Sequence, residues 1–254
     1  MQITRFERGL QNRVALVTGA AAGNGRAFCE RLCEEGARLI IADLVPANET
    51  ERAVRELGGE VLSVQADMTV QEDVERVVQT AIDTYGRIDI LVHNVGHYSE
   101  EPFELLSYTE WCKTLHITLD SIFHTVRAVL PHMKRAGFGR IITFSSDTVW
   151  LGTPYLTHYV TAKMGVIGFT RSLAAEVGKY GITINTITVG LTATQSATTS
   201  AAMSPLLEHI IPTQAVHRAD EPEDIANVVA FLALPASGII TGQTINVDGG
   251  VARH

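Results

Sequence analysis

The sequence is poor in cysteine and in positive charge, and it contains no long apolar run. Its three cysteines are too few, and odd in number, for a disulfide framework, which indicates reduced thiols and a cytoplasmic protein. The net charge of −8 excludes an extended basic face, so we expect no nucleic acid partner. No apolar run reaches the roughly 18 residues that a membrane span needs, so we expect no membrane partner either.

Cys29 and Cys33 lie four residues apart on a predicted helix, which is the spacing of half a metal site. A structural zinc site needs about four cysteine or histidine ligands, and no second pair lies nearby. We therefore interpret both cysteines as packing residues and predict no metal.

Apolar residues are abundant, at 46% of the chain against 19% charged residues, which excludes a disordered chain. Short β-branched runs alternate with longer helical patterns from end to end, as in the βαβ units of a parallel sheet. Several runs are apolar throughout, as expected of strands that helices cover on both faces. We predict a single-domain, Rossmann-like, doubly wound α/β fold over residues 1–254, with a cofactor half (about 13–140) and a catalytic half (about 141–254).

Seven strands are predicted, at 13–18, 38–42, 61–65, 88–93, 140–145, 183–187 and 244–247, with long helices at 71–85 and 158–179. Residues 191–212 differ from the rest, since they begin small and polar and then become apolar. The alternatives are a surface loop and a mobile lid over a pocket. We favour the lid, because long loops in compact domains are usually functional and the apolar half would be costly to expose.

A glycine-rich turn follows the first strand and leads directly into a helical pattern. Glycines let the backbone approach a diphosphate, whose charge the helix N-terminus then stabilises. Asp43, at the end of the second strand, can accept hydrogen bonds from both ribose hydroxyls and would repel a 2′-phosphate, which favours NAD over NADP. The alternatives are a simple turn role for Asp43 and tolerance of the phosphate through Arg26. The turn residues expected to contact the cofactor are Gly19, Gly23, Asn24 and Gly25.

Further cofactor contacts are expected where other strands end, because ligands bind at the carboxyl edge of open α/β sheets. Asp67 and Met68 follow the third strand, and Asn94 and Gly96 follow the fourth. Asp67 could equally cap the next helix, but its position favours an adenine contact.

Tyr159 and Lys163 lie one helical turn apart on the same helix face. A tyrosine titrates near 10, so a nearby ammonium and a positively charged nicotinamide ring would be needed to favour the phenolate as a base. Ser146, just past the fifth strand, could hydrogen-bond the substrate oxygen. These three residues form the predicted catalytic set.

Together, TGAAAGNG, HNVG, Ser146 and YVTAK resemble the motifs of the classical short-chain dehydrogenase/reductase family, over nearly the whole chain. The resemblance implies that Lys163 also holds the ribose, that Tyr159 also contacts the cofactor, and that the protein is a homotetramer with its two longest helices at one interface. It further implies cofactor contacts from Val189, Gly190, Thr192 and Thr194. The stretches GTPYLTHYVTAKMGVIGFTRSLAAEVGKYGIT and ITGQTINVDGGVARH resemble members that use NAD to oxidise alcohols next to an aromatic ring, such as 1-phenylethanol or pyridoxal.

The sequence departs from the family pattern at four positions. Thr118 aligns with a catalytic asparagine that holds a water linking the lysine to solvent, so the proton relay is expected to differ. His93 and Val95 alter the turn after the fourth strand, and Val189 replaces a rigid proline.

Aromatic and polar side chains near the catalytic set should line the substrate pocket, together with parts of 191–212. They are His97, Tyr98, Thr148, Trp150 and Tyr155. Such a lining suits an aryl or other bulky apolar ketone. The alternatives are packing for Trp150 and a solvated loop position for His97, and we assign no role to His158.

The sequence therefore predicts an NAD-dependent oxidoreductase that interconverts a small secondary, aryl alcohol and its ketone. A primary alcohol on a polar ring, as in pyridoxal, is the alternative within the enzyme class. A non-catalytic, NAD-binding interaction protein is the alternative outside it, suggested by Thr118.

Overall fold

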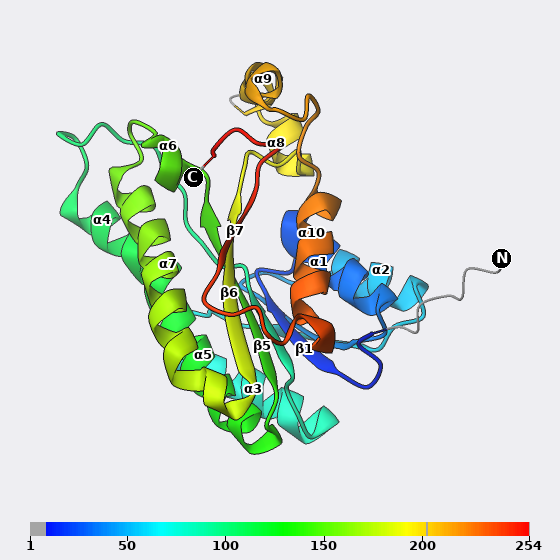
Figure 1. Cartoon of the computed structure of the whole chain (residues 1–254). Coiled ribbons are helices and arrows are strands. Elements are labelled where there is room, and N and C mark those ends of the chain that lie inside the picture. Colours follow the sequence, from blue (N-terminus) through cyan, green and yellow to red (C-terminus); the bar gives the residue numbers. More distant parts are fainter. Residues whose placement is uncertain (1–8, 202, 254) are drawn as a thin grey trace.

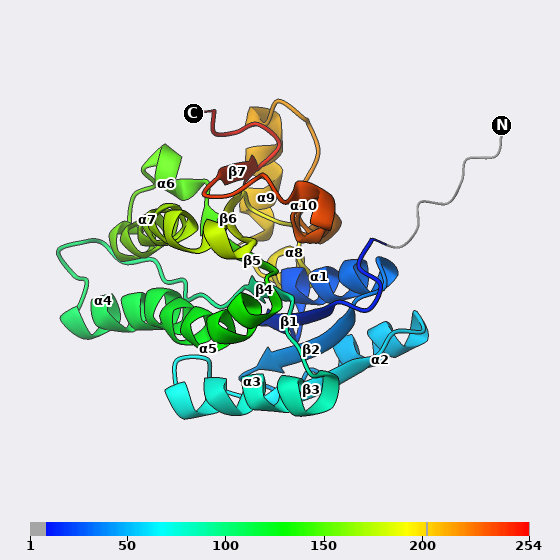
Figure 2. The same ribbon diagram turned by 60° about the horizontal axis from the view of Figure 1, so that its bottom comes forward.

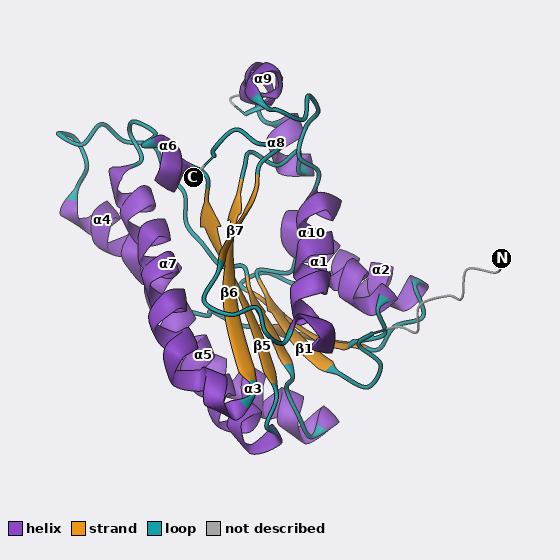
Figure 3. Ribbon diagram, viewed as in Figure 1, coloured by secondary structure: helices purple, strands orange, loops and turns teal. Residues whose placement is uncertain are grey.

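The computed structural model describes residues 9–201 and 203–253, which form one seven-stranded sheet in the order β3-β2-β1-β4-β5-β6-β7 (Figures 1 and 3). Every pairing is parallel. The predicted Rossmann-like, doubly wound fold is thus confirmed. The strands are β1 (Val14–Thr18), β2 (Arg38–Asp43), β3 (Val61–Gln65), β4 (Ile90–His93), β5 (Gly139–Ser146), β6 (Ile182–Val189) and β7 (Thr244–Val247).

Helices cover both faces of the sheet (Figure 2). One face carries α1 (Gly23–Glu34), α2 (Asn48–Glu56) and α10 (Pro222–Ala233). The other carries α3 (Gln71–Tyr85), α4 (Tyr108–Leu115), α5 (Ser121–Ala136) and α7 (Thr157–Val177). Each face has its own apolar core; Phe28 of α1, for example, stacks on Phe144 of β5 at 4.9 Å between ring centroids. Cys29 and Cys33 are buried in the first core, as expected of packing residues.

The strand order reverses between β1 and β4. From β1 the chain winds outward to β3, then returns to the other side of β1 to continue with β4. The loops after β1 and β4 therefore leave the sheet in opposite directions, and a crevice opens between them at the carboxyl edge. This topology places the predicted cofactor residues on neighbouring loops.

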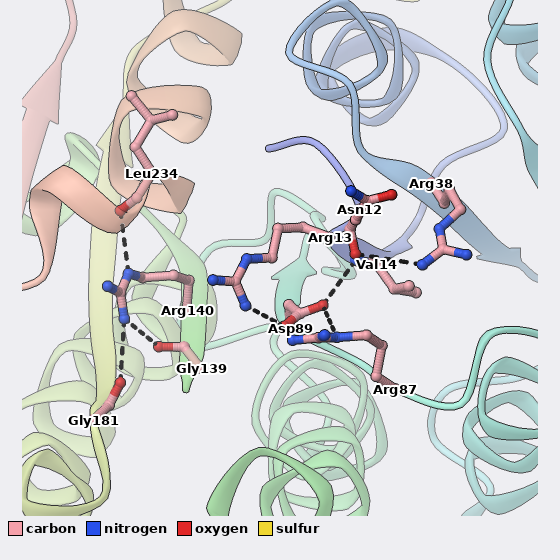
Figure 4. A network of polar contacts seen from close by, with 10 residues as sticks. All are labelled: Asn12, Arg13, Val14, Arg38, Arg87, Asp89, Gly139, Arg140, Gly181 and Leu234. Carbon is pink, nitrogen blue, oxygen red and sulfur yellow. Dashed lines mark hydrogen bonds and ion pairs between the residues drawn. The ribbon is translucent and has the colours of Figure 1, made fainter. Parts of the chain in front are cut away.

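At the opposite, amino edge of the sheet, a buried carboxylate links the start of β1 to the segment before β4 (Figure 4). Asp89, directly before β4, accepts hydrogen bonds from Arg13 Nη1 at 2.9 Å, Arg87 Nε at 2.7 Å and the Val14 backbone N–H at 3.0 Å. Beside it, the buried Arg140 guanidinium donates to backbone carbonyls. Those carbonyls belong to Gly139, Gly181 and Leu234.

The structure differs from the prediction mainly in residues 191–212. They are not a long loop, because α8 (Gln195–Thr199) and α9 (Ser204–Ile210) occupy most of the segment, at the same end of the molecule as α6 (Thr148–Leu151) (Figure 1). Thr194 caps α8 by accepting the Ala197 N–H at 3.3 Å, and a proline opens α9. Residue 202 lies outside the described part. Within 9–201 and 203–253, no helix combines the length and apolarity of a membrane span.

Candidate active site

A cleft of about 500 Å³ lies at the carboxyl edge, at the point where the strand order reverses. Six residues predicted to contact the cofactor line it, and so does His97 from the predicted substrate pocket. The six are Gly19, Asp43, Asp67, Met68, Asn94 and Gly96. The structure therefore brings these residues together from the ends of four strands.

The turn after β1 leaves little room for side chains at its glycine positions. Gly19 and Gly23 adopt φ of +62° and +55°, a left-handed conformation that favours glycine. A Cβ on Gly25 would lie 2.0 Å from the Gly19 carbonyl oxygen. Buried Asn24 Oδ1 has no hydrogen-bond partner among the described residues. A tight glycine turn at a helix N-terminus, where backbone N–H groups are free to donate, fits the diphosphate of a dinucleotide.

Asp43 lines the cleft as the last residue of β2. Its two carboxylate oxygens accept the backbone N–H groups of Ala21 at 2.8 Å and Val45 at 3.1 Å. Asp43 thus ties the glycine turn to the second strand while presenting its charge to the cleft. Arg26, which could have tolerated a phosphate, donates instead to Glu30 at 2.7 Å and lies 3.7 Å from Glu49.

Asp67 and Asn94 hold the neighbouring loops. Asp67 Oδ1 accepts the Thr69 N–H at 2.9 Å and its hydroxyl at 2.7 Å, so it stabilises the turn that precedes α3 rather than capping the helix itself. Asn94 Nδ2 donates to the Gly19 carbonyl at 2.9 Å, which joins the β4 loop to the glycine turn.

The predicted catalytic residues lie together at the ends of β5 and α7. Ser146 is the last residue of β5 rather than the first beyond it, and Tyr159 and Lys163 occupy the first two turns of α7. Lys163 Nζ donates to the Phe144 carbonyl at 3.0 Å and lies 5.6 Å from the centre of the Tyr159 ring.

The pKa values of this pair are set chiefly by burial. Burial lowers the pKa of the Lys163 ammonium to about 8. Burial also raises the pKa of the Tyr159 phenol to about 12, although its hydrogen bond with Ser146 acts in the opposite direction. Without a bound cofactor, the pKa of Tyr159 is therefore raised rather than lowered, because desolvation outweighs the distant ammonium of Lys163.

Thr118, at the position of the family's asparagine, lies in a π-helical turn, His116–Asp120, between α4 and α5. It is fully buried, and its Oγ1 accepts the His97 backbone N–H at 3.4 Å. Nearby, burial lowers the pKa of His93 to about 3, which keeps this imidazole neutral beside Ser121 Oγ at 3.0 Å.

The segment after β6 closes one side of the crevice. Val189 ends β6, and Gly190 is so confined that a Cβ would lie 2.6 Å from Asp220 Oδ2. Buried Thr192 donates to the Gly190 carbonyl at 3.3 Å. Thr194 lies over the glycine turn, since its Cγ2 is 3.3 Å from the site of a Cβ on Gly23.

The predicted pocket residues divide into two groups. Tyr98 meets the Tyr159 ring edge-on, with centroids 5.5 Å apart, Thr148 bonds to Ser146, and Trp150 is half-buried on α6. Tyr155 is 57% exposed, with a left-handed φ of +66°, and Tyr98 is itself 45% exposed, so neither ring sits in an enclosed pocket.

The sequence reasoning missed a polar chain beside the pocket. His97 is half-buried rather than solvated, and its Nε2 lies 2.6 Å from Glu110 Oε1. Ser99 Oγ donates to the same oxygen at 2.8 Å and lies 2.9 Å from His158 Nε2. His158 is fully buried and belongs to this polar chain, whereas the sequence analysis assigned it no role at the site. These contacts join residues 59 positions apart, so no local sequence pattern marks them.

A family model described as Enoyl-(Acyl carrier protein) reductase matches residues 19–252, nearly the whole chain. The chain belongs to the short-chain dehydrogenase/reductase family. The match includes the glycine turn, Ser146, Tyr159 and Lys163. A nicotinamide cofactor and redox chemistry between CH–OH and C=O groups follow from this membership.

This short-chain dehydrogenase/reductase is similar along almost its full length to several known proteins. It is 38% identical to the short-chain reductase protein NovJ of Streptomyces niveus, over 94% of each chain. It is also 38% identical to the (2S)-[(R)-hydroxy(phenyl)methyl]succinyl-CoA dehydrogenase subunit BbsD of Thauera aromatica, over 95% of this chain and 97% of that protein. Among solved structures, levodione reductase superposes with a TM-score of 0.89 at 32% identity, over 94% and 97% of the two chains.

Proposed function

We propose that this protein is an NAD-dependent dehydrogenase that interconverts a secondary aryl alcohol and its ketone. The observation that carries the proposal is the convergence of Ser146, Tyr159 and Lys163 beside a cleft lined by Gly19, Asp43 and Asn94. When bound, the nicotinamide ring accepts a hydride from the alcohol carbon, or returns it to the ketone carbon.

In the oxidising direction, Tyr159 takes the hydroxyl proton as the C–O bond becomes C=O. Ser146 donates a hydrogen bond to the reacting oxygen. Lys163, held by the Phe144 carbonyl, contributes the positive charge that favours the phenolate and binds the ribose. Since burial raises the pKa of Tyr159 to about 12, the phenolate depends on the added positive charge of the bound cofactor. In reduction the same tyrosine returns the proton.

Three observations support NAD over NADP. Asp43 presents a carboxylate to the cleft, where it would repel a 2′-phosphate. Arg26, the cation nearest the glycine turn in sequence, is engaged by Glu30 and Glu49. The following residue, Leu44, is apolar and lines the same cleft. We place Asp67 and Met68 at the adenine.

The aryl substrate is supported by the side chains around Tyr159 and by one relative. Tyr98 offers an aromatic edge, and the half-buried Trp150 lies on the adjacent α6. The name of the relative BbsD describes a hydroxyl on the carbon next to a phenyl ring, which is the arrangement we propose here. The polar chain from His97 to His158 favours the second candidate, a primary alcohol on a polar ring such as pyridoxal.

We also propose that the protein is a cytoplasmic homotetramer. A groove of about 420 Å³ runs between α5 and α7, the two longest helices, and is mostly apolar. Phe123, at 48% exposure, lies at its edge. Burying this face against a second copy would remove exposed apolar area from water.

The test is a spectrophotometric screen of aryl alcohols and pyridoxal with NAD, and of the matching ketones with NADH. We expect NADH to form with a secondary aryl alcohol at a higher kcat/KM than with pyridoxal. Binding of NADH without turnover of any alcohol, ketone or aldehyde would instead establish the non-catalytic interpretation.

A further inference from the structure

The Ser146 hydroxyl has a defined set of partners. Thr148 donates to Ser146 Oγ from its hydroxyl at 2.9 Å and from its backbone N–H at 3.3 Å. Ser146 in turn donates to Asp147 Oδ1 at 3.1 Å. Because Thr148 supplies protons to the serine oxygen, the proton of Ser146 is left to two acceptors, the Asp147 carboxylate at 3.1 Å and the Tyr159 oxygen. A substrate oxygen that needs this proton has to compete with a carboxylate for it.

Asp147 is itself buried, at 4% exposure, in the company of two further carboxylates. Asp248, after β7, and Asp220, before α10, are also buried and face it, and Tyr159 on α7 lies on the side of Ser146. Asp248 is satisfied by the Gly250 and Ala252 N–H groups, at 2.9 and 2.7 Å. Asp220 Oδ2, by contrast, is buried without a hydrogen-bond partner among the described residues.

These surroundings shift the pKa of Asp147 towards neutral pH. Burial, with the repulsion of Asp248 and Asp220, raises the pKa of Asp147 to about 6, although the bond from Ser146 acts in the opposite direction. Burial and the repulsion of neighbouring carboxylates likewise raise the pKa of Asp220 to about 6. The ionised Asp147 also raises the pKa of Tyr159.

Building on the proposed function, we propose that Asp147 is a positioning residue for Ser146, whose carboxylate retains the serine proton and yields it to the substrate oxygen once Asp147 is protonated. Reduction of a ketone requires both Tyr159 and Ser146 to donate to one oxygen. The reductive kcat therefore rises as pH falls through the titration of Asp147. No atom of Asp147 contacts the substrate in this scheme.

The first test does not depend on activity. The ¹³C resonances of labelled aspartate carboxyls are followed through a pH titration, with Asp147 assigned by its loss in Asp147→Asn. Ser146→Ala should raise the pKa of Asp147 by about 1, because a hydrogen bond to the ionised form is removed. Ser145→Ala is the matched control, since Ser145 donates to the Lys163 carbonyl and should leave the titration unchanged. An equal response of Asp147 to both substitutions overturns the proposal, even if the enzyme turns over aryl ketones normally.

The second test follows ketone reduction against pH. The amide introduced by Asp147→Asn keeps an acceptor of the same shape without charge. In this variant kcat at pH 7.5 should reach the level that the unaltered protein shows near pH 5.5, about 25-fold higher, and the acidic dependence should disappear. Asp220→Asn removes a repelling carboxylate and should move the acidic limb to lower pH without abolishing it.

A wild-type pH profile in both variants overturns the proposal. If the ¹³C shifts occur as expected but wild-type protein reduces no ketone, the proposed function fails while the Ser146–Asp147 contact stands.

Discussion

Lys163 Nζ donates to the Phe144 carbonyl at 3.0 Å, which fixes a helix side chain onto the buried strand β5. The same nitrogen lies 3.3 Å from the place that a Cβ on Gly96 would occupy, so the loop after β4 packs against the ammonium. Lys163 is thus enclosed by strand β5, the loop after β4 and its own helix, with Tyr159 one turn away. This enclosure, rather than an ion pair, sets the protonation behaviour of the catalytic lysine.

The first prediction concerns stability and pH. The pKa of Lys163 is about 8 in the folded protein against an ordinary value of 10.5, so between these pH values the unfolded chain holds a proton that the folded protein lacks. The free energy of unfolding should therefore rise with pH across this window, by up to about 3 kcal/mol from this residue. Urea unfolding at pH 7.5 and 9.5 should show the rise in wild-type protein and in Lys179→Met, whose lysine is exposed, but not in Lys163→Met.

The second prediction concerns the base. Tyr159→Phe should lower kcat by about 10² to 10⁴, because the proton acceptor is removed, while the Kd for NADH stays within about a factor of three. Stopped assays at high enzyme concentration and fluorescence titration with NADH measure the two quantities. Tyr180→Phe, in the turn that follows α7, is the control. An unchanged kcat in Tyr159→Phe would show that another group is the base.

The third prediction concerns cofactor choice. Asp43→Asn keeps the shape of the side chain and an acceptor for one of the two N–H groups, of Ala21 and Val45, but removes the charge that would repel a 2′-phosphate. The ratio of kcat/KM for NADP to that for NAD should rise at least about tenfold, which corresponds to about 1.4 kcal/mol. Asp67→Asn should weaken the binding of NAD and NADP equally and leave the ratio of their kcat/KM values unchanged. If Asp43→Asn behaves in the same way as Asp67→Asn, Asp43 is only a turn residue.

The fourth prediction concerns the proton relay. Thr118→Asn should raise kcat by about threefold to tenfold if the amide restores a water link between Lys163 and solvent. The substitution enlarges a fully buried side chain, so we expect it to lower the free energy of unfolding by about 1 to 3 kcal/mol. Thr118→Val leaves the His97 N–H without its acceptor and should not raise kcat. Equal rates in Thr118→Asn and wild type would show that another water path suffices.

The fifth prediction concerns assembly. Phe123→Asp places a charge beside the groove between α5 and α7 and should convert tetramers to smaller species in sedimentation velocity. Leu57→Asp, a comparably exposed leucine after α2, should leave the sedimentation coefficient unchanged. Retention of the wild-type coefficient by Phe123→Asp would place any interface elsewhere.

The fold could be predicted because the buried strands of a parallel sheet are short apolar runs in the sequence. The carboxyl ends of these strands also all lie at one edge of the sheet. The gathering of Asp43, Asn94 and Ser146 follows from those two facts alone. The bounds of the strands were predicted less closely, since β5 extends one residue further and takes in Ser146.

Other parts of the site depend on tertiary contacts that no local pattern encodes. The π-helical turn at Thr118 and the chain from His97 to His158 arise from packing between α4, α7 and the loop after β4. The raised pKa of Tyr159 in the protein without cofactor has the same origin: the sequence shows a lysine one turn away, but not how thoroughly both groups are desolvated. Helix α8 was missed because its small, polar residues have weak helix propensity and depend on the Thr194 cap.

The Asp89 cluster, finally, bears on how such a protein can change its chemistry. Asp89 binds Arg13, Arg87 and the start of β1 at the amino edge (Figure 4). Ser146 and Asp43 lie at the opposite edge, where β5 and β2 end. Residues around the substrate can therefore be exchanged without loosening the contacts that clamp the strands together. The two edges of the sheet can therefore change independently in evolution. Mutant libraries that seek new substrates should vary residues at the carboxyl edge and keep Asp89 and its arginines unchanged.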